Sequence, residues 1–142
     1  MIIPDVNLLI YAVDSSSQFH DRARTWWEQL LNAEGTVGLP WTVSLGFVRI
    51  TTSARAFSNP LTFAQASAYV DEWLSIPAVE PIDPGPGHWR RVHELLLPIG
   101  VGGKLVSDAH LAAIAIEQHA VLATHDRDFD RFAGLKCVNP LK

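Results

Sequence analysis

The apolar residues of this chain fall into two kinds of segment that alternate along its length. Short apolar runs bounded by glycine, proline or polar residues predict buried β-strands, whereas longer segments with apolar residues at every third or fourth position predict helices. The strands are expected at residues 1–4, 36–39, 78–82, 120–124 and 136–139. The helices are expected at 6–13, 20–32, 41–52, 62–74, 88–97 and 106–119, with a helical turn at 128–132.

The alternation of strands and helices indicates the fold class. Segment 106–119 is the clearest helix, because Leu111, Ala112, Ala115 and Ile116 lie on one side of it. An order in which short strands alternate with helices predicts an α/β fold with a parallel sheet and helices on both of its faces. In such sheets ligands bind beyond the carboxyl ends of the strands.

Length and composition fit one domain spanning residues 1–142. The chain has 142 residues, of which 48% are hydrophobic and 18% are charged, so it can bury a core. A single cysteine, Cys137, excludes an internal disulfide framework and a multi-cysteine zinc site, and we expect it in the core or in a strand of a reduced protein. The N-terminus lacks the basic start of a signal peptide, and no apolar stretch is long enough for a membrane span. These features predict a cytoplasmic protein with no membrane partner.

The net charge of −4 argues against a nucleic-acid partner, because proteins that bind nucleic acids are usually basic. This objection weakens if several carboxylates surround a divalent cation, which changes the local sign of the charge. A local basic surface could come from arginines at positions 22, 24, 49, 55, 90, 91, 127 and 131.

Four aspartates stand at positions where such a site could form. Asp5 follows the first strand, Asp108 lies at the start of the clearest helix, and Asp126 and Asp128 follow the strand at 120–124. Each taken alone has a simple explanation, because aspartate is a favoured helix N-cap. Taken together, they would meet where a parallel sheet opens its crevice, and like charges at short range disfavour joint ionisation unless a cation lies between them.

A hard divalent cation with oxygen ligands is the usual partner of such a cluster, and Mg²⁺ suits it, with Mn²⁺ also compatible. A carboxylate-held cation beside an open crevice suits phosphodiester hydrolysis, because it polarises a phosphoryl oxygen and lowers the pKa of a bound water. Such a reaction needs no serine, cysteine or histidine nucleophile.

Three motifs resemble those of the PIN-domain family, in particular its VapC toxins. They are Pro4–Ala12 (PDVNLLIYA), Ser107–Ala113 (SDAHLAA) and Ala123–Phe129 (ATHDRDF), in the order and at the spacing of that family. The resemblance covers essentially the whole chain. It implies a three-layer α/β/α sandwich with a central parallel sheet of four or five short strands. It also implies a Mg²⁺- or Mn²⁺-dependent endoribonuclease, a homodimer, and inhibition by a VapB-type antitoxin.

One departure from the family pattern concerns the number of metal ions. Many members carry a glutamate on the helix after the second strand, and here Gly46 stands at the expected place in a stretch without an acid. We therefore expect one ion, held by Asp5, Asp108 and Asp126, with Asp128 binding it directly or through water. Fewer carboxylates should also weaken the affinity for the metal.

Other polar residues near these motifs have two readings each. Asn7 could orient Asp5 or a metal-bound water, or it could help to cap the helix. Ser107 and Thr124 could bond the metal's waters or a phosphate, although an N-cap and a strand end explain them as well. His125 is expected to be a solvent-facing loop residue, and the other histidines show no ligand spacing.

Two further features lie outside the acidic motifs. Gly102-Gly103-Lys104 fails as a phosphate-binding loop, because Pro98 and Leu105 stand where that motif needs Gly and Ser or Thr. We expect a flexible loop near the site, whose Lys104 could touch RNA phosphate. Trp26 and Trp27 point about 100° apart on a helix, so at least one should be exposed or at an interface and could mark an antitoxin-binding groove, although core packing of both explains them nearly as well.

The sequence thus predicts the toxin of a type II toxin–antitoxin system that cleaves structured RNA, with tRNA as the leading candidate from the resemblance. Two alternatives stay open. The missing glutamate could mark a degenerate module that binds RNA or an antitoxin without cleavage. A phosphoryl-transfer enzyme with Asp5 as nucleophile is disfavoured, because residue 7 is asparagine where that chemistry usually has a second aspartate.

Overall fold

The computed structural model describes residues 1–142 and contains one parallel sheet of five short strands. The strand order is β3-β2-β1-β4-β5, so the first strand lies in the middle of the sheet. The strand bounds are β1 (Ile2–Pro4), β2 (Val37–Pro40), β3 (Val79–Ile82), β4 (Val121–Ala123) and β5 (Lys136–Val138). All four pairings are parallel, and in the register Ile2 lies opposite both Val37 and Val121.

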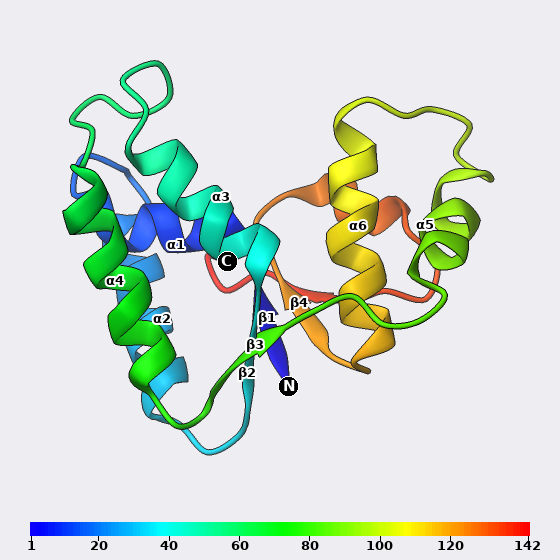
Figure 1. Ribbon diagram of the computed structural model, residues 1–142, viewed down its shortest axis with the longest axis horizontal. Coiled ribbons are helices and arrows are strands. Elements are labelled where there is room, and N and C mark those ends of the chain that lie inside the picture. Colours follow the sequence, from blue (N-terminus) through cyan, green and yellow to red (C-terminus); the bar gives the residue numbers. More distant parts are fainter.

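Helices cover both faces of this sheet, which confirms the predicted α/β/α sandwich. Helices α1–α4 lie on one side and α5 and α6 on the other (Figure 1). Their bounds are α1 (Val6–Val13), α2 (His20–Asn32), α3 (Trp41–Thr51), α4 (Phe63–Ser75), α5 (His88–Leu96) and α6 (Lys104–Glu117), and a short 3₁₀ helix, η1, covers Arg127–Arg131. Helix α1 packs on α2 and α3, α5 packs on α6, and η1 also contacts α6.

The core lies between these layers, and residue size decides how closely they approach. Ile3 and Leu122 of the central strands are completely buried. Helix α6 faces the core mainly with alanines, such as Ala109 and Ala112, whose short side chains let the helix lie close to the sheet. In β2 a Cβ atom on Gly38 would lie 2.7 Å from the Met1 sulfur and 2.9 Å from Cγ1 of the buried Ile3, so any larger residue would force these side chains to move.

The start of α6 differs from the sequence-based expectation. The helix begins at Lys104, two residues before the predicted start, and Asp108 is therefore its fifth residue. The helix is preceded by Gly103, whose φ of +63° is a conformation open to glycine. Because Gly103 occupies the N-cap position, the N-cap interpretations of Ser107 and Asp108 are wrong, and so is the expectation that Lys104 lies in the loop.

Two smaller expectations are settled by burial. Cys137 lies in strand β5, as predicted, but it is exposed rather than part of the core. Trp27 is buried and packs edge-on against Trp73, whereas Trp26 is half-buried, so neither ring is fully exposed. No helix of the structure combines the length and the apolar character needed to cross a membrane.

Candidate metal centre

The predicted acidic residues lie at the carboxyl ends of β1 and β4. Asp5 directly follows β1, and Asp126 lies on the loop that leaves β4. The two strands are neighbours, and the Asp5 backbone N–H donates to the Ala123 carbonyl at 2.8 Å, which continues their pairing to the edge of the sheet. Helix α6 brings Asp108 to the same edge. The crevice predicted from the strand–helix alternation is therefore where the acids lie.

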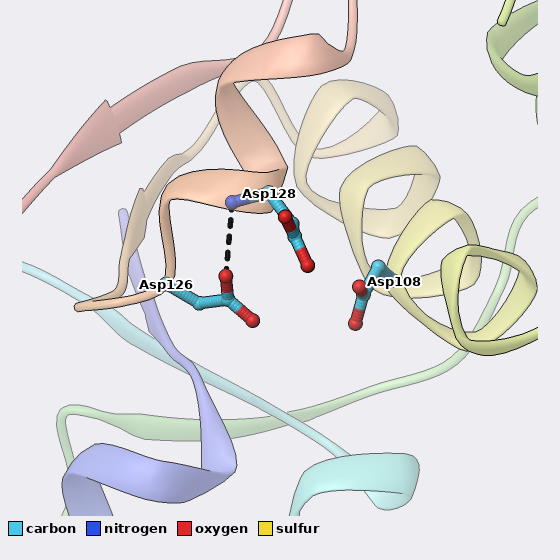
Figure 2. Close-up of side chains that lie close together, drawn as sticks. All are labelled: Asp108, Asp126 and Asp128. Carbon is cyan, nitrogen blue, oxygen red and sulfur yellow. Dashed lines mark hydrogen bonds between the residues drawn. The ribbon is translucent and has the colours of Figure 1, made fainter.

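Three carboxylates converge at this edge. Asp108, Asp126 and Asp128 each offer one oxygen, and these oxygens all lie within 4.8 Å of one another. Figure 2 shows Asp108 on α6 facing the other two aspartates across a narrow gap. The Asp108 side chain is only 13% exposed, Asp126 is half-buried, and Asp128 is exposed. A site with one open side and oxygen donors alone has the composition that Mg²⁺ and Mn²⁺ bind.

Asp126 belongs to this cluster and is also a helix cap. Its Oδ1 accepts a hydrogen bond from the Asp128 backbone N–H at 2.9 Å, which caps η1, as the simple interpretation expected. Its Oδ2 is the atom that faces the cluster, 2.9 Å from the Lys104 ammonium. Burial by itself would raise the pKa of Asp126, but the hydrogen bonds from Asp128 and Lys104 outweigh burial and lower this pKa. The capping and cluster interpretations are therefore compatible.

Lys104 lies against all three carboxylates. Its Nζ is 2.9 Å from Asp126 Oδ2, 3.1 Å from Asp108 Oδ2 and 3.4 Å from Asp128 Oδ2. The hydrogen bond to Asp126, followed by that to Asp108, raises the pKa of Lys104, so it stays charged at neutral pH. Burial raises the pKa of Asp108, and Lys104 opposes this rise.

Asp5 lies beside the carboxylate triad, which is formed by Asp108, Asp126 and Asp128, rather than in it. It is only 6% exposed, and its Oδ2 accepts a hydrogen bond from the Thr124 hydroxyl at 2.9 Å. Burial raises the pKa of Asp5, and the nearby charges of Asp108 and Asp126 raise it further. Asp5 occupies the N-cap position of α1, but its side chain makes no capping hydrogen bond.

Thr124 connects Asp5 to the triad. Its hydroxyl donates to Asp5 and accepts from the Asp126 backbone N–H at 3.0 Å, and the side chain is buried. One hydroxyl thus fixes the carboxylate of Asp5 and the backbone of the loop that carries Asp126. A role of Thr124 as partner of a metal-bound water or phosphate stays a prediction, and in the structure its hydroxyl holds two acidic residues in place.

A cavity of about 170 Å³ extends the site between α1, α3 and α6. Asp5 and Asp108 both line it, together with Ser107 and Arg49, the one basic residue of its wall. Gly46 also lines it, and a Cβ atom there would meet only Val6 Cγ2, at an ordinary 3.6 Å. A side chain at position 46 would therefore enter the cavity that Asp5 also lines.

Two expectations about neighbouring polar residues have different outcomes. Asn7 is exposed at the start of α1, and its orienting role remains a prediction. His125 is not a solvent-facing loop residue as expected. It is half-buried, its ring centroid lies 4.7 Å from that of Phe19, and its Nδ1 lies 3.2 Å from Asn139 Nδ2. This tilted ring contact explains the difference, because Phe19 and His125 are distant in sequence.

Sequence reasoning missed a second polar cluster, which joins α5 to α6. His88 Nδ1 lies 2.6 Å from Glu117 Oε2, and His88 Nε2 lies 2.8 Å from His110 Nδ1. The Gly85 backbone N–H donates to Glu117 Oε1 at 2.8 Å. Because a carboxylate only accepts, His88 Nδ1 donates to Glu117, and His88 Nε2 and His110 Nδ1 share a second hydrogen bond. Burial lowers the pKa of His110, and His88 lowers it further, which favours a neutral His110 ring.

The only sequence signal for this cluster was the seven-residue spacing of His110 and Glu117, which places them on one face of a helix. His88 lies 22 residues before His110, and nothing local connects the two. The cluster does not include the carboxylate triad, and its hydrogen bonds link the start of α5 to the last turn of α6.

Comparison with known proteins gives three kinds of match. A family model described as the PIN domain matches residues 2–135. Ribonuclease VapC33 of Mycobacterium tuberculosis (strain H37Rv) is 45% identical over 142 residues, which is 100% of this chain and 99% of the relative.

Two solved structures share the fold. VapBC2 from Rickettsia felis, bound to a DNA fragment from its promoter, has a TM-score of 0.71 at 22% identity and covers 98% of both chains. VapC20 of M. tuberculosis, described as a sarcin-ricin loop cleaving toxin, has a TM-score of 0.68 at 14% identity, over 96% of this chain and 99% of that one.

Proposed function

Because the chain belongs to the PIN-domain family, in which it is similar to the VapC ribonucleases, we propose that it is a metal-dependent endoribonuclease and the toxin of a type II toxin–antitoxin system. The observation that carries this proposal is the convergence of Asp108, Asp126 and Asp128 at the sheet edge, with Asp5 beside them. Structured RNA is the proposed substrate, and tRNA is the first candidate to test.

The acidic residues are assigned to the metal as follows. Asp108 and Asp126 are the principal ligands of one Mg²⁺ or Mn²⁺ ion, and the exposed Asp128 binds it directly or through water. Asp5 completes the set from the neighbouring cavity, with its Oδ2 held by the Thr124 hydroxyl. The oxygen-only donor set fits a hard cation.

The chemistry divides between the ion and the chain. When bound, the cation supplies Lewis acidity and a water of lowered pKa for attack on the phosphodiester. Asp5, Asp108 and Asp126 would hold the cation at one place, and Thr124 keeps Asp5 and the Asp126 loop in fixed relation. Arg49, in the wall of the cavity shared by Asp5 and Asp108, is positioned to bind a phosphate of the substrate. No side chain needs to act as a covalent nucleophile.

The experiment that tests this proposal compares Asp5→Asn with the wild type. RNA is sequenced after expression of each protein, and cleavage by the purified proteins is measured with Mg²⁺ or Mn²⁺. The variant should lose cleavage at least about a hundredfold while it stays folded, because a ligand charge is removed without a change of size. Wild-type products should carry 5′-phosphate and 3′-hydroxyl ends. Asp21→Asn, at an exposed position of α2, is the matched control. Undiminished cleavage by Asp5→Asn would refute the assignment.

The alternative function, binding without cleavage, rests on Gly46, which stands where the resemblance places a further acidic metal ligand in many PIN-domain proteins. Calorimetric titration separates the two. Saturable binding of Mn²⁺ that is lost in Asp126→Asn supports the nuclease, and no metal binding by the wild type supports the degenerate module.

The antitoxin is assigned to a cavity of about 380 Å³ between α1, α2 and α4. Trp27 and Trp73 line its floor, the Trp27 Nε1 is buried without a hydrogen-bond partner, and Arg24 and Glu28 lie at its edge. An amphipathic segment of a VapB-type antitoxin fits this combination of aromatic floor and charged edge. Leu31→Asp, inside the cavity, should weaken binding of the co-expressed antitoxin, whereas Thr25→Asp, on α2 outside this cavity, should not.

As part of the same proposal, the protein forms a homodimer and is located in the cytoplasm. Light scattering of the purified protein at micromolar concentration should give twice the mass of the chain, which is 15.7 kDa. Fractionation of expressing cells should recover the protein with the soluble cytoplasmic fraction.

A further inference from the structure

Lys104 is the cation that lies nearest to where a metal ion would bind. We propose that its ammonium group is a tethered competitor, which occupies the carboxylate triad of the metal-free protein and has to be displaced when a divalent ion binds. This inference rests on the proposed metal-dependent function. It concerns the chain's own residue rather than the identity of the ion.

The geometry shows that the ammonium and the ion compete for the same atoms. Lys104 Nζ contacts Asp126 Oδ2 at 2.9 Å, Asp108 Oδ2 at 3.1 Å and Asp128 Oδ2 at 3.4 Å. Carboxylate oxygens bind Mg²⁺ at about 2.0–2.1 Å, so an ion bound to these atoms would lie close to the present position of Nζ. The metal ion and the Lys104 ammonium cannot both occupy this position, because two cations so close together repel each other without water between them to screen the repulsion.

The negative charges of the triad explain why a cation in contact with all three carboxylates is favoured. Three carboxylates with oxygens within 4.8 Å of one another repel each other strongly when all are ionised. One ammonium in contact with all three relieves this repulsion and holds Asp108 of α6 against the loop of Asp126 and Asp128. The site is thereby kept in a closed arrangement, at the cost of a weaker affinity for the metal.

The position of Lys104 makes its displacement easy. Lys104 is the first residue of α6, it lies four residues before Asp108, and its side chain is 66% exposed. The ammonium can therefore rotate into solvent without any change in the helix, and exposed ion pairs of this kind are individually weak. After displacement it remains at the mouth of the site, within reach of a phosphate bound to the metal.

The test is calorimetric titration of the full chain with Mn²⁺, which does not depend on activity. Lys104→Met removes the charge and keeps the length of the side chain, and its Kd for Mn²⁺ should fall by about fivefold or more, the lower range of a typical coupling between two ligands. Lys136→Met removes an equal charge from strand β5 and should leave the Kd within about twofold of the wild type.

A second measurement follows thermal unfolding of the same proteins. In EDTA, Lys104→Met should have a lower Tm than the wild type, since its carboxylates lack a counter-charge. At saturating Mn²⁺ the two Tm values should converge, because the ion supplies that charge in both.

The outcomes separate this inference from the proposed function. If the wild type and both lysine variants bind Mn²⁺ with equal Kd, or Lys104→Met binds more weakly, the competitor role of Lys104 is overturned and metal dependence stands. If none of them binds Mn²⁺, the metal-dependent function and the inference fall together.

Discussion

At the scale of single residues, the site depends on side chains with two partners. Asp126 uses one oxygen for the Asp128 backbone N–H and the other for the carboxylate cluster. Thr124 donates to Asp5 and accepts from the Asp126 backbone N–H. In such residues stability and metal binding are separable, because a substitution can keep one partner and lose the other.

Asp126 offers the clearest separation. Asp126→Asn keeps an Oδ1 acceptor for the Asp128 N–H, so its free energy of unfolding in EDTA should stay within about 0.5 kcal/mol of the wild type. Asp126→Ala should lose about 1 kcal/mol, the usual value of a helix cap. Both variants should lose Mn²⁺ binding by at least about tenfold. Urea denaturation and calorimetry measure these quantities, and equal stability of the two variants would show that the cap contributes nothing.

Gly46 is a position where a side chain can be added. It lies inside α3, and a Cβ atom there makes only an ordinary contact with Val6, so Gly46→Ala should raise the free energy of unfolding by about 0.5–1 kcal/mol. Gly46→Glu should in addition tighten Mn²⁺ binding, because its carboxylate enters the cavity shared by Asp5 and Asp108. Calorimetry on both variants checks this, with Gly46→Ala as control. Equal affinities would mean that a glutamate at this position does not reach the ion.

At the scale of elements, helix α6 positions much of the site. Its buried alanines bring it close to the sheet, its second turn carries Asp108, and its first residue is Lys104. Its last turn carries Glu117, which accepts from Gly85 and His88 and so ties the start of α5 to α6. The helix thus joins the carboxylate site at one end to a separate hydrogen-bonded cluster towards the other.

The Glu117 cluster should contribute to stability without affecting the metal. Glu117→Ala leaves the Gly85 N–H and His88 without their acceptor and should lower the free energy of unfolding by about 1–3 kcal/mol. Glu94→Ala removes the same charge from an exposed position of α5 and should change it by less than about 0.5 kcal/mol. Chemical denaturation of both variants gives the comparison, and Mn²⁺ affinity should be unchanged in each. A loss no larger than that of Glu94→Ala would contradict the proposed link between α5 and α6.

At the scale of the whole molecule, the strand order brings the distant acids together. Because β1 and β4 are neighbours in the order β3-β2-β1-β4-β5, residues more than a hundred positions apart meet at one sheet edge. The acidic site accounts for part of the net charge of −4, which by itself would not have suggested an RNA-binding protein. A bound divalent cation changes the local sign, as it does at other carboxylate sites.

Metal binding should therefore stabilise the whole fold. An ion that binds only the native state at a hundred times its Kd adds about 2.7 kcal/mol to the free energy of unfolding. Saturating Mn²⁺ should raise the Tm of the wild type by several degrees, and EDTA should reverse this change. Asp126→Asn should show a much smaller rise in differential scanning calorimetry. An equal rise in that variant would place the stabilising ion elsewhere.

Much of the fold could be predicted from the sequence because its signals are local. Apolar residues at every third or fourth position indicate a helix with one buried face, and a short continuous apolar run indicates a buried strand. Both patterns lie within the element that they predict. Helices α1 and α2 begin and end where the pattern predicted, and the ends of the strands differ from the expected ends by no more than one residue. The start of α6 was missed because Gly103 takes the N-cap position, and a glycine there carries a weaker signal than the serine and aspartate that follow it.

The sequence by itself determined the alternation of strands and helices, the identity of the acidic residues and their place after strands, because each follows from local spacing and residue chemistry. Only the tertiary structure decided which of these residues meet. In the folded chain Asp108 lies close to Asp126 and Asp128, and Lys104 contacts these carboxylates. Asp5 accepts a hydrogen bond from Thr124, and His88 is hydrogen-bonded to His110. The physical reason is that strand order and helix packing set the distances between residues remote in sequence, and those depend on the burial of the entire core rather than on any one segment.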